Sequence, residues 1–65
     1  MTKRTQNRVK ELRKQAGLSQ QTLAYQLGVY RNTISNWERG YSRISLENAE
    51  RLAKFFQVSI DDLLG

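Results

Sequence analysis

One local pattern occurs three times in the chain: an apolar residue, then a serine, then a second apolar residue five positions after the first. A serine in this place caps a helix, because its hydroxyl accepts a hydrogen bond from a backbone amide of the first turn. The two apolar residues pack over the cap as a hydrophobic staple and fix how the chain enters the helix. The pattern predicts helix starts at Leu18-Ser19…Leu23, Ile44-Ser45…Ala49 and Val58-Ser59…Leu63.

Apolar residues elsewhere recur at helical spacing, and the strict alternation typical of strands is absent. The sequence therefore predicts an all-α fold, a single domain of five helices covering residues 1–65. The first helix is expected over roughly residues 5–16, and Gly17, Gly28 and Gly40 are expected to end the first three helices. The predicted apolar faces, helix by helix, are Val9, Leu12 and Ala16; Leu23, Ala24 and Leu27; Ile34 and Trp37; Leu46, Ala49, Leu52, Ala53 and Phe56; and Ile60, Leu63 and Leu64.

The third helix repeats the staple as Val29…Ile34, but Tyr30 stands where the other helices have serine. A tyrosine hydroxyl is too far from its own backbone to cap the helix, and losing a cap typically costs about 0.5–2 kcal/mol. Two explanations are open: Tyr30 occupies a tolerant surface position, or it reaches outward to a ligand.

Composition restricts the chemistry available to the chain, which contains no His, Cys or Pro. Because His and Cys are the usual general bases, nucleophiles and zinc ligands, we expect no enzyme activity, no metal and no cofactor, although a Ser-Lys mechanism is not formally excluded. No apolar run approaches the roughly 20 residues of a membrane span. The N-terminal MTKRTQNRVKELRK lacks the apolar stretch of a signal peptide, so we expect a cytoplasmic domain.

The net charge of +5 is unevenly placed. Residues 1–16 hold six bases and one acid, residues 17–43 three bases and one acid, and residues 44–65 two bases and four acids. This asymmetry favours one face that meets a polyanion and another kept away from it. A solvated surface with a positive bias is the alternative.

Gly28, Val29 and Tyr30 form a short, glycine-containing turn between the second and third helices, the arrangement of a helix-turn-helix motif. Residues 20–39, QQTLAYQLGVYRNTISNWER, resemble the helix-turn-helix of the lambda-repressor-like family of phage repressors, Cro and bacterial Xre-type regulators. NRVKELRKQAGLSQ, ISNWERG, SLENAERLAKFF and VSIDDLL also look like family segments in family order. The resemblance implies a compact five-helix DNA-binding domain with its helix-turn-helix at about residues 19–40.

The outer face of the third helix, residues 31–39, carries the expected base contacts. Ile34 and Trp37 point inward at helical spacing, so polar residues lie outward or at the edges. A major groove admits one α-helix, and its base edges are read by Arg at guanine and by Asn at adenine. From this chemistry and from the resemblance, we expect Arg31, Asn32, Ser35 and Asn36 to contact bases; a merely solvated helix face is the alternative.

A second set of residues is expected to contact the DNA backbone. The start of the second helix offers free amides and a favourable dipole to an anion, and the resemblance implies that Gln20 clamps a phosphate there. The loop after the third helix would meet the other strand. The predicted backbone contacts are Ser19, Gln20, Tyr30, Arg39, Tyr41, Ser42 and Arg43, while Lys3, Arg4 and Arg8 add either a flexible arm or long-range attraction.

The resemblance also implies an ion pair between Arg13 and Glu38, joining the first helix to the third. We assign this pair to structure in preference to DNA contact.

The predicted function is a transcriptional regulator, a repressor of phage or bacterial type, that binds double-stranded DNA sequence-specifically. Family members commonly bind palindromic operators as dimers, which implies a homodimer. The expected dimer surface is the 41–46 loop with the fifth helix, including Ile44, Val58, Ile60 and Leu64. The alternative is that these four side chains belong entirely to the core. The alternative is a protein-interaction module such as an antitoxin or adaptor. A membrane-binding role is disfavoured, because the chain lacks the Trp/Phe/Leu face that a helix at a membrane surface needs. No small-molecule ligand is evident from the sequence.

Overall fold

The three predicted serine caps are present. In the computed structural model, which describes residues 7–65, the Ser19 hydroxyl accepts a hydrogen bond of 3.0 Å from the Thr22 amide. Ser19 has an extended backbone, and the helix begins at the next residue. The equivalent bonds at the later helices run from the Asn48 amide to Ser45 (3.2 Å) and from the Asp62 amide to Ser59 (3.0 Å).

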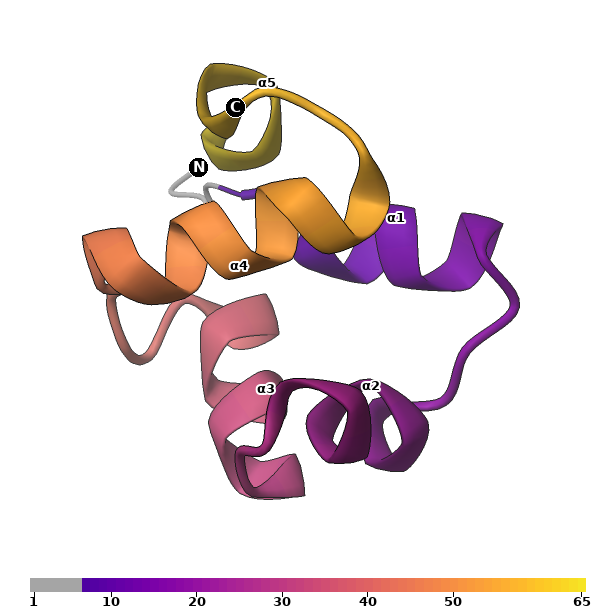
Figure 1. Ribbon diagram of the computed structural model, residues 1–65. Coiled ribbons are helices and arrows are strands. Elements are labelled where there is room, and N and C mark those ends of the chain that lie inside the picture. The colour runs from indigo at the N-terminus through magenta and orange to yellow at the C-terminus, as the bar shows by residue number, and fades with distance from the viewer. Residues whose placement is uncertain (1–6) are drawn as a thin grey trace, which may run out of the picture.

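Five α-helices and no strand make up residues 7–65, which confirms the predicted all-α fold (Figure 1). The first helix is shorter than predicted, because it begins at Val9, where the Asn7 side-chain oxygen accepts the Val9 amide at 3.0 Å. The helices are α1 (Val9–Gln15), α2 (Gln20–Leu27), α3 (Arg31–Arg39), α4 (Leu46–Phe56) and α5 (Ile60–Leu64).

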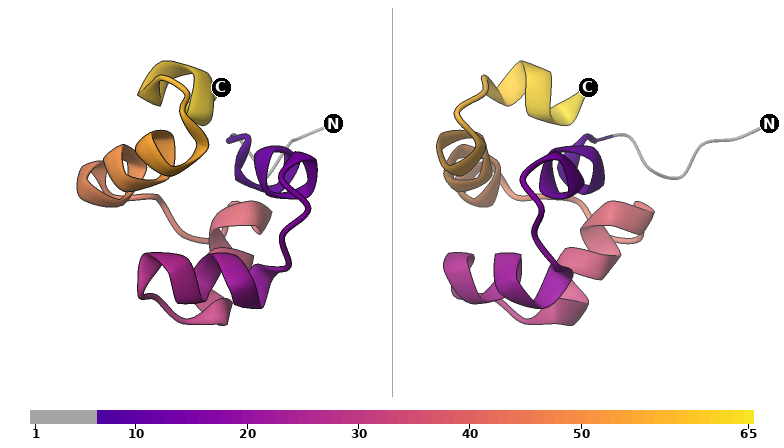
Figure 2. Two further views of the ribbon diagram at one scale, coloured as in Figure 1. Left: turned by 45° about the vertical axis from the view of Figure 1, so that its right-hand side comes forward. Right: turned by 90° about the vertical axis from the view of Figure 1, so that its right-hand side faces the viewer.

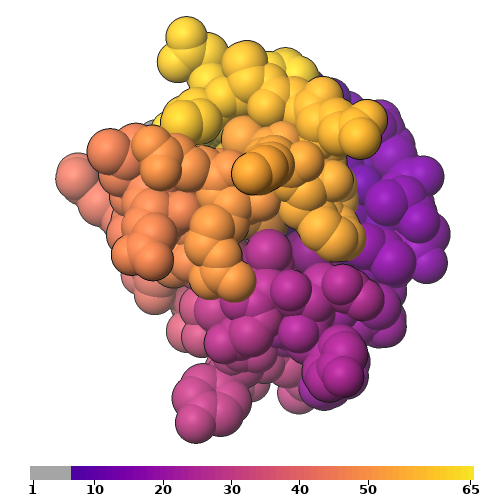
Figure 3. Space-filling view, viewed as in Figure 1, coloured from indigo at the N-terminus to yellow at the C-terminus, as the bar shows by residue number. Residues whose placement is uncertain are grey.

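The helices are stacked so that α2 and the start of α3 lie at one end of the molecule and α5 lies at the other. Helix α2 packs on α3, α1 contacts α3, and α5 packs on α4. Two further views show the same order, with α1 and α4 between the ends (Figure 2). The α2–α3 segment therefore forms one exposed end of the surface, and the acidic α5 forms the opposite end (Figure 3).

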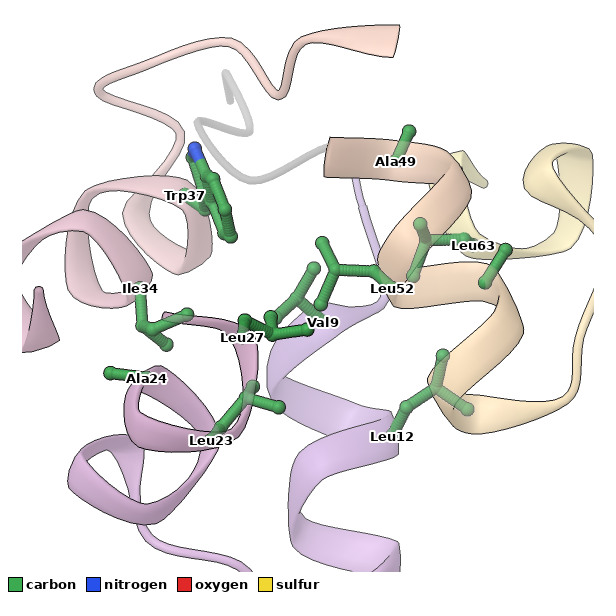
Figure 4. Packing of buried hydrophobic residues seen from close by; sticks show 11 residues of the cluster. Val9, Leu12, Leu23, Ala24, Leu27, Ile34, Trp37, Ala49, Leu52 and Leu63 are labelled. Atoms are coloured by element: carbon green, nitrogen blue, oxygen red, sulfur yellow. The ribbon is translucent and has the colours of Figure 1, made fainter. Parts of the chain in front are cut away.

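All five helices contribute to one core, where α1, α2, α3 and α4 point apolar side chains toward one another (Figure 4). Removing such side chains from water supplies the main favourable free energy of folding, about 1.5–3 kcal/mol for each large residue. The buried apolar residues are Val9, Leu12, Leu23, Ala24, Leu27, Ile34, Trp37, Ala49, Leu52, Ala53 and Leu63.

Three residues predicted on apolar faces are exposed instead, and all three stand at helix ends. Leu46, the first residue of α4, is 67% exposed, and Leu64, the last residue of α5, is 42% exposed. Ala16 is also exposed, because α1 ends at Gln15 and the chain turns at Gly17. Helical spacing places a residue on a face, but it does not show how far along the helix the core extends.

Several hydrogen bonds join helices that are distant in sequence. The Asn7 side-chain amide donates to the Trp37 carbonyl at the end of α3 at 3.0 Å. The Arg8 backbone amide donates to the Leu63 carbonyl of α5 at 2.8 Å. Arg51 of α4 donates to the Leu27 carbonyl at the end of α2. The bonds to Trp37 and Leu27 hold the ends of α3 and α2 to the rest of the domain, and the bond to Leu63 joins the start of α1 to α5.

Within residues 7–65, no helix has the length and apolar character needed to span a membrane.

The middle and the start of α4's predicted apolar face are expected to respond differently to truncation. Leu52→Ala removes a fully buried side chain and should lower the free energy of unfolding by about 2–5 kcal/mol, or leave the chain unfolded. Leu46→Ala, the matched control, should change it by less than about 0.5 kcal/mol. Urea unfolding followed by circular dichroism measures both, and equal losses would contradict this assignment of the core.

Candidate nucleic-acid interface

The turn between α2 and α3 is set by Gly28 and Val29. Gly28 ends α2 with a left-handed backbone (φ 71°) that residues with a Cβ adopt at a cost. The Val29 amide then donates to the Ala24 carbonyl at 3.0 Å, and Val29 packs against the core. Ala24 is 1% exposed, so its small side chain lets the two helices approach closely. Helix α3 is thereby held against α2 by a turn of residues 28–30.

Helix α3 divides its side chains between the core and a polar outer face. Ile34 and Trp37 are buried in the core. The four predicted base-contacting residues stand at other positions of the helix: Arg31 and Asn32 are exposed, and Ser35 and Asn36 are half-buried.

Arg13 and Glu38 form a buried ion pair between α1 and α3. The Arg13 Nε donates to one carboxylate oxygen of Glu38 at 2.7 Å, and its Nη2 donates to the other at 3.2 Å. The side chains are 10% and 3% exposed. Arg13 also donates to the Leu18 carbonyl at 2.7 Å, so one guanidinium joins α1, the loop before α2, and α3. Removing one partner of such a pair leaves an uncompensated buried charge.

Gln20, predicted to contact DNA, takes part in the same cluster. Its side-chain amide donates to the Glu38 carboxylate at 3.0 Å. Sequence reasoning missed this bond, since Gln20 and Glu38 are 18 positions apart and no local pattern relates them. The neighbouring Ser19 is exposed and uses its hydroxyl as the α2 cap.

Tyr30 is 84% exposed at the start of α3. Its backbone is extended like that of the serine caps, but within the described residues its side chain makes no capping hydrogen bond. The Thr33 amide is instead bonded to the Tyr30 carbonyl at 2.9 Å. The phenol therefore extends into solvent beside Arg31 at the exposed end of the helix-turn-helix.

The loop after α3 presents the remaining predicted backbone contacts. Tyr41, Ser42 and Arg43 are exposed, and the Arg39 guanidinium lies 5.8 Å from the centre of the Tyr41 ring. The loop and Leu64 of α5 line one shallow hollow, which also includes Asn7 and Ile44. The structure thus places the predicted DNA-contacting loop beside part of the predicted dimer surface.

The other residues of the predicted dimer surface lie closer to the core. Ile44, Val58 and Ile60 are half-buried and pack against the core cluster. Of the four residues predicted on this surface, Leu64 is the exposed one.

Arg8 is bound at the α5 end of the molecule. Its guanidinium hydrogen-bonds Glu11 at 3.2 Å and Asp62 at 2.5 Å, and these bonds raise the pKa of Arg8 above its ordinary value. Of the two alternatives for Arg8, the flexible arm is therefore wrong, because its side chain joins α1 to α5. Lys3 and Arg4 lie outside the described residues.

A family model described as helix-turn-helix matches residues 9–63. The chain belongs to the Cro- and Xre-type helix-turn-helix family. It is 42% identical over 58 residues to the HTH-type transcriptional activator BcrR of Enterococcus faecalis, covering 89% of this chain and 28% of BcrR. It is 42% identical over 59 residues to the HTH-type transcriptional regulator AnsR of Bacillus subtilis (strain 168), covering 91% of this chain and 51% of AnsR. The chain thus spans at most about half the length of these two relatives.

A solved structure of a helix-turn-helix controller has the same all-α fold. The restriction-modification controller protein C.AhdI from Aeromonas hydrophila matches with a TM-score of 0.76 at 38% identity, covering 85% of this chain and 83% of that one. The fold and the family predicted from the sequence are therefore confirmed. Among residues 7–65, no group of three or more His, Cys, Asp or Glu side chains could hold a metal ion.

The buried pair should show strong energetic coupling. Arg13→Met and Glu38→Gln should each lower the free energy of unfolding by about 3–5 kcal/mol, because each leaves a buried polar or charged partner without its match. The double variant should lose much less than the sum, which a double-mutant cycle on urea unfolding measures. The exposed pair Arg8–Glu11 is the control and should couple far more weakly. Additive losses at Arg13 and Glu38 would contradict a structural role for the pair.

Restoring a cap at the start of α3 should stabilise the domain. Tyr30 already has the extended backbone of a cap residue, so Tyr30→Ser should raise the free energy of unfolding by about 1 kcal/mol. Tyr25→Ser is the matched control, since Tyr25 is 80% exposed but lies within α2. Thermal unfolding of both variants measures the difference, and no gain at Tyr30 would show that the missing cap has no cost.

Proposed function

We propose that the protein is a transcriptional regulator that binds double-stranded DNA sequence-specifically by inserting α3 into the major groove. The single observation that carries the proposal is the division of α3, whose apolar residues are buried while Arg31, Asn32, Ser35 and Asn36 share the other side. The major groove of DNA admits an α-helix, and side chains of these types hydrogen-bond to the base edges in it. The family supplies the expectation that this helix is the one inserted.

Each of the four side chains suits one kind of base contact. Arg31 is exposed in the first turn of α3 and donates two parallel hydrogen bonds, as guanine O6 and N7 require. Asn32 and Asn36 pair in the same bidentate way with adenine N6 and N7, and Ser35 contacts either kind of base. One good bidentate pair gives about 1–3 kcal/mol of discrimination against a wrong base.

Contacts to the DNA backbone would fix the position of α3 in the groove. Ser19 and Gln20 stand at the amide-rich start of α2, where an anion is favoured. Gln20 gives one amide hydrogen to Glu38, so its second hydrogen is the one for a phosphate. Tyr30 adds a phenol next to Arg31. On the following loop, the residues assigned to the backbone are Arg39, Tyr41, Ser42 and Arg43.

The assembly we propose is a homodimer on a palindromic operator, with half-sites about 34–36 Å apart. The acidic α5 lies at the end opposite the start of α3 (Figure 2), where it is kept from the duplex and free for a second copy. Leu64, 42% exposed beside Ile44, is the apolar contact we assign to that partner. A dimer bound to a promoter in the cytoplasm would repress transcription by occupying the site. This mode of repression needs no contacts beyond those to DNA.

A protein-interaction role for α3 has less support. A version of this helix that binds protein would present apolar or aromatic anchors that fill pockets of the partner. The outer face of α3 has Arg, Asn, Ser and Asn, and the adjacent Tyr30 is the one aromatic candidate on it. Its composition therefore favours nucleic acid over protein as the partner.

Selection from a random duplex library tests the proposal. The wild-type chain should enrich one palindromic motif bound by two copies, and its affinity should fall steeply with salt as counterions are released. Arg31→Ala should relax the preference at one base pair of each half-site while the rest of the motif remains. Lys54→Gln on α4, also exposed, is the charge control and should leave the motif unchanged. Absence of any enriched motif would refute sequence-specific binding, and a uniform loss on every sequence would reassign Arg31 to a phosphate.

A further inference from the structure

A basic recess lies between α1 and the outer face of α3. It has a volume of about 380 Å³ and is lined by Lys10 and Lys14 of α1, Gln20 of α2, and Arg31, Ser35 and Arg39 of α3. The buried pair of Arg13 and Glu38 also lines it. Sequence reasoning gave Lys10 and Lys14 no role beyond the general positive charge of the first 16 residues.

The charges of the recess are unbalanced. Glu38 is the one carboxylate among the residues that line it, and its two oxygens already accept hydrogen bonds from Arg13 and Gln20. Within residues 7–65, the salt bridges do not include Lys10, Lys14 or Arg31. Besides Arg13, which is paired with Glu38, four cationic side chains line the recess: Lys10, Lys14, Arg31 and Arg39.

The two lysines repel each other in the free protein. They are four positions apart on α1, which places both on one side of the helix. Like charges at this spacing destabilise a helix, and an anion between them removes the repulsion. The α1 acid in the same stretch, Glu11, is instead bonded to Arg8.

We propose that this recess binds a phosphate group and that Lys10 and Lys14 are its positioning residues. The ammonium group of a lysine binds phosphate as a point charge at the end of a flexible side chain. The planar guanidinium of Arg31, with its parallel donors, suits a base edge better. Arg39 borders the recess as well, but its guanidinium lies near the Tyr41 ring. Arg31 is in no ion pair either, but it is assigned to a base edge, so Lys10 and Lys14 are the two recess cations left to bind a phosphate.

The source of the phosphate is the DNA backbone, and in this respect the inference rests on the proposed function. Arg31 and Ser35 belong both to the recess and to the predicted reading face of α3. A helix inserted in the major groove has a phosphate strand along each edge, so the strand on the α1 side would pass over Lys10 and Lys14. These contacts position the protein and carry no sequence information.

The experiment compares Lys10→Gln/Lys14→Gln with Lys54→Gln, which removes one exposed lysine of α4 outside the recess. Fluorescence anisotropy measures binding of the selected duplex across a range of NaCl concentrations. Two lost phosphate contacts should reduce the slope of log K against log [NaCl] by about 1.8, because each contributes about 0.9. The selected motif should be unchanged, and the control should keep the wild-type slope. Both lysines are exposed, so the double variant should fold, which circular dichroism checks.

The possible outcomes separate this inference from the proposed function. A steep wild-type slope that the double variant retains would overturn the recess as a phosphate site and leave the DNA-binding proposal intact. A changed motif in the double variant would also overturn it, since it would make the lysines base contacts. If the wild type binds no DNA, titration with inorganic phosphate followed by amide NMR shifts decides the matter. Shifts around the recess that the double variant loses would support a free phosphate as ligand, and their absence would overturn the site.

Discussion

The orientation of α3 depends on one buried carboxylate. Glu38 stands on α3 beside Trp37, and its carboxylate accepts hydrogen bonds from Arg13 of α1 and Gln20 of α2. Within residues 7–65, every buried side-chain nitrogen and oxygen has a hydrogen-bond partner, so the cluster is fully satisfied. A satisfied buried network permits one arrangement of its members, whereas apolar contacts alone tolerate sliding. The helix that carries the polar face is thereby held in one position relative to the two helices beside it.

Local sequence patterns predicted most of the fold because the signals that set helix boundaries are themselves local. A cap such as Ser19 bonds an amide three positions away, and Gly28 provides the backbone conformation that ends α2. The same reasoning failed where the outcome depends on what lies next to a residue in space. Leu46 and Leu64 have the right spacing for burial, but they stand at helix ends and remain exposed.

The candidate site was predictable in its residue types and less so in its contacts. The outer face of α3 follows from the buried positions of Ile34 and Trp37, which helical spacing alone supplies. The bond from Gln20 to Glu38 and the bond from Arg51 to the Leu27 carbonyl join residues 18 and 24 positions apart. Neither has a repeating pattern, because each depends on how helices pack and not on how one helix forms. The grouping of Lys10 and Lys14 with Arg31 has the same origin.

In helix α3, the residues that stabilise the fold differ from those on the outer face. Ile34 and Trp37 belong to the core and Glu38 to the buried cluster, whereas Arg31 and Asn32 are exposed and belong to neither. Substitutions of Arg31 and Asn32 should therefore leave the scaffold unaltered, as substitutions at exposed positions usually do. Under the proposed function, a duplicated gene would acquire a new target by a few changes at such exposed positions of one helix, and no intermediate along that route would have to pass through a misfolded protein.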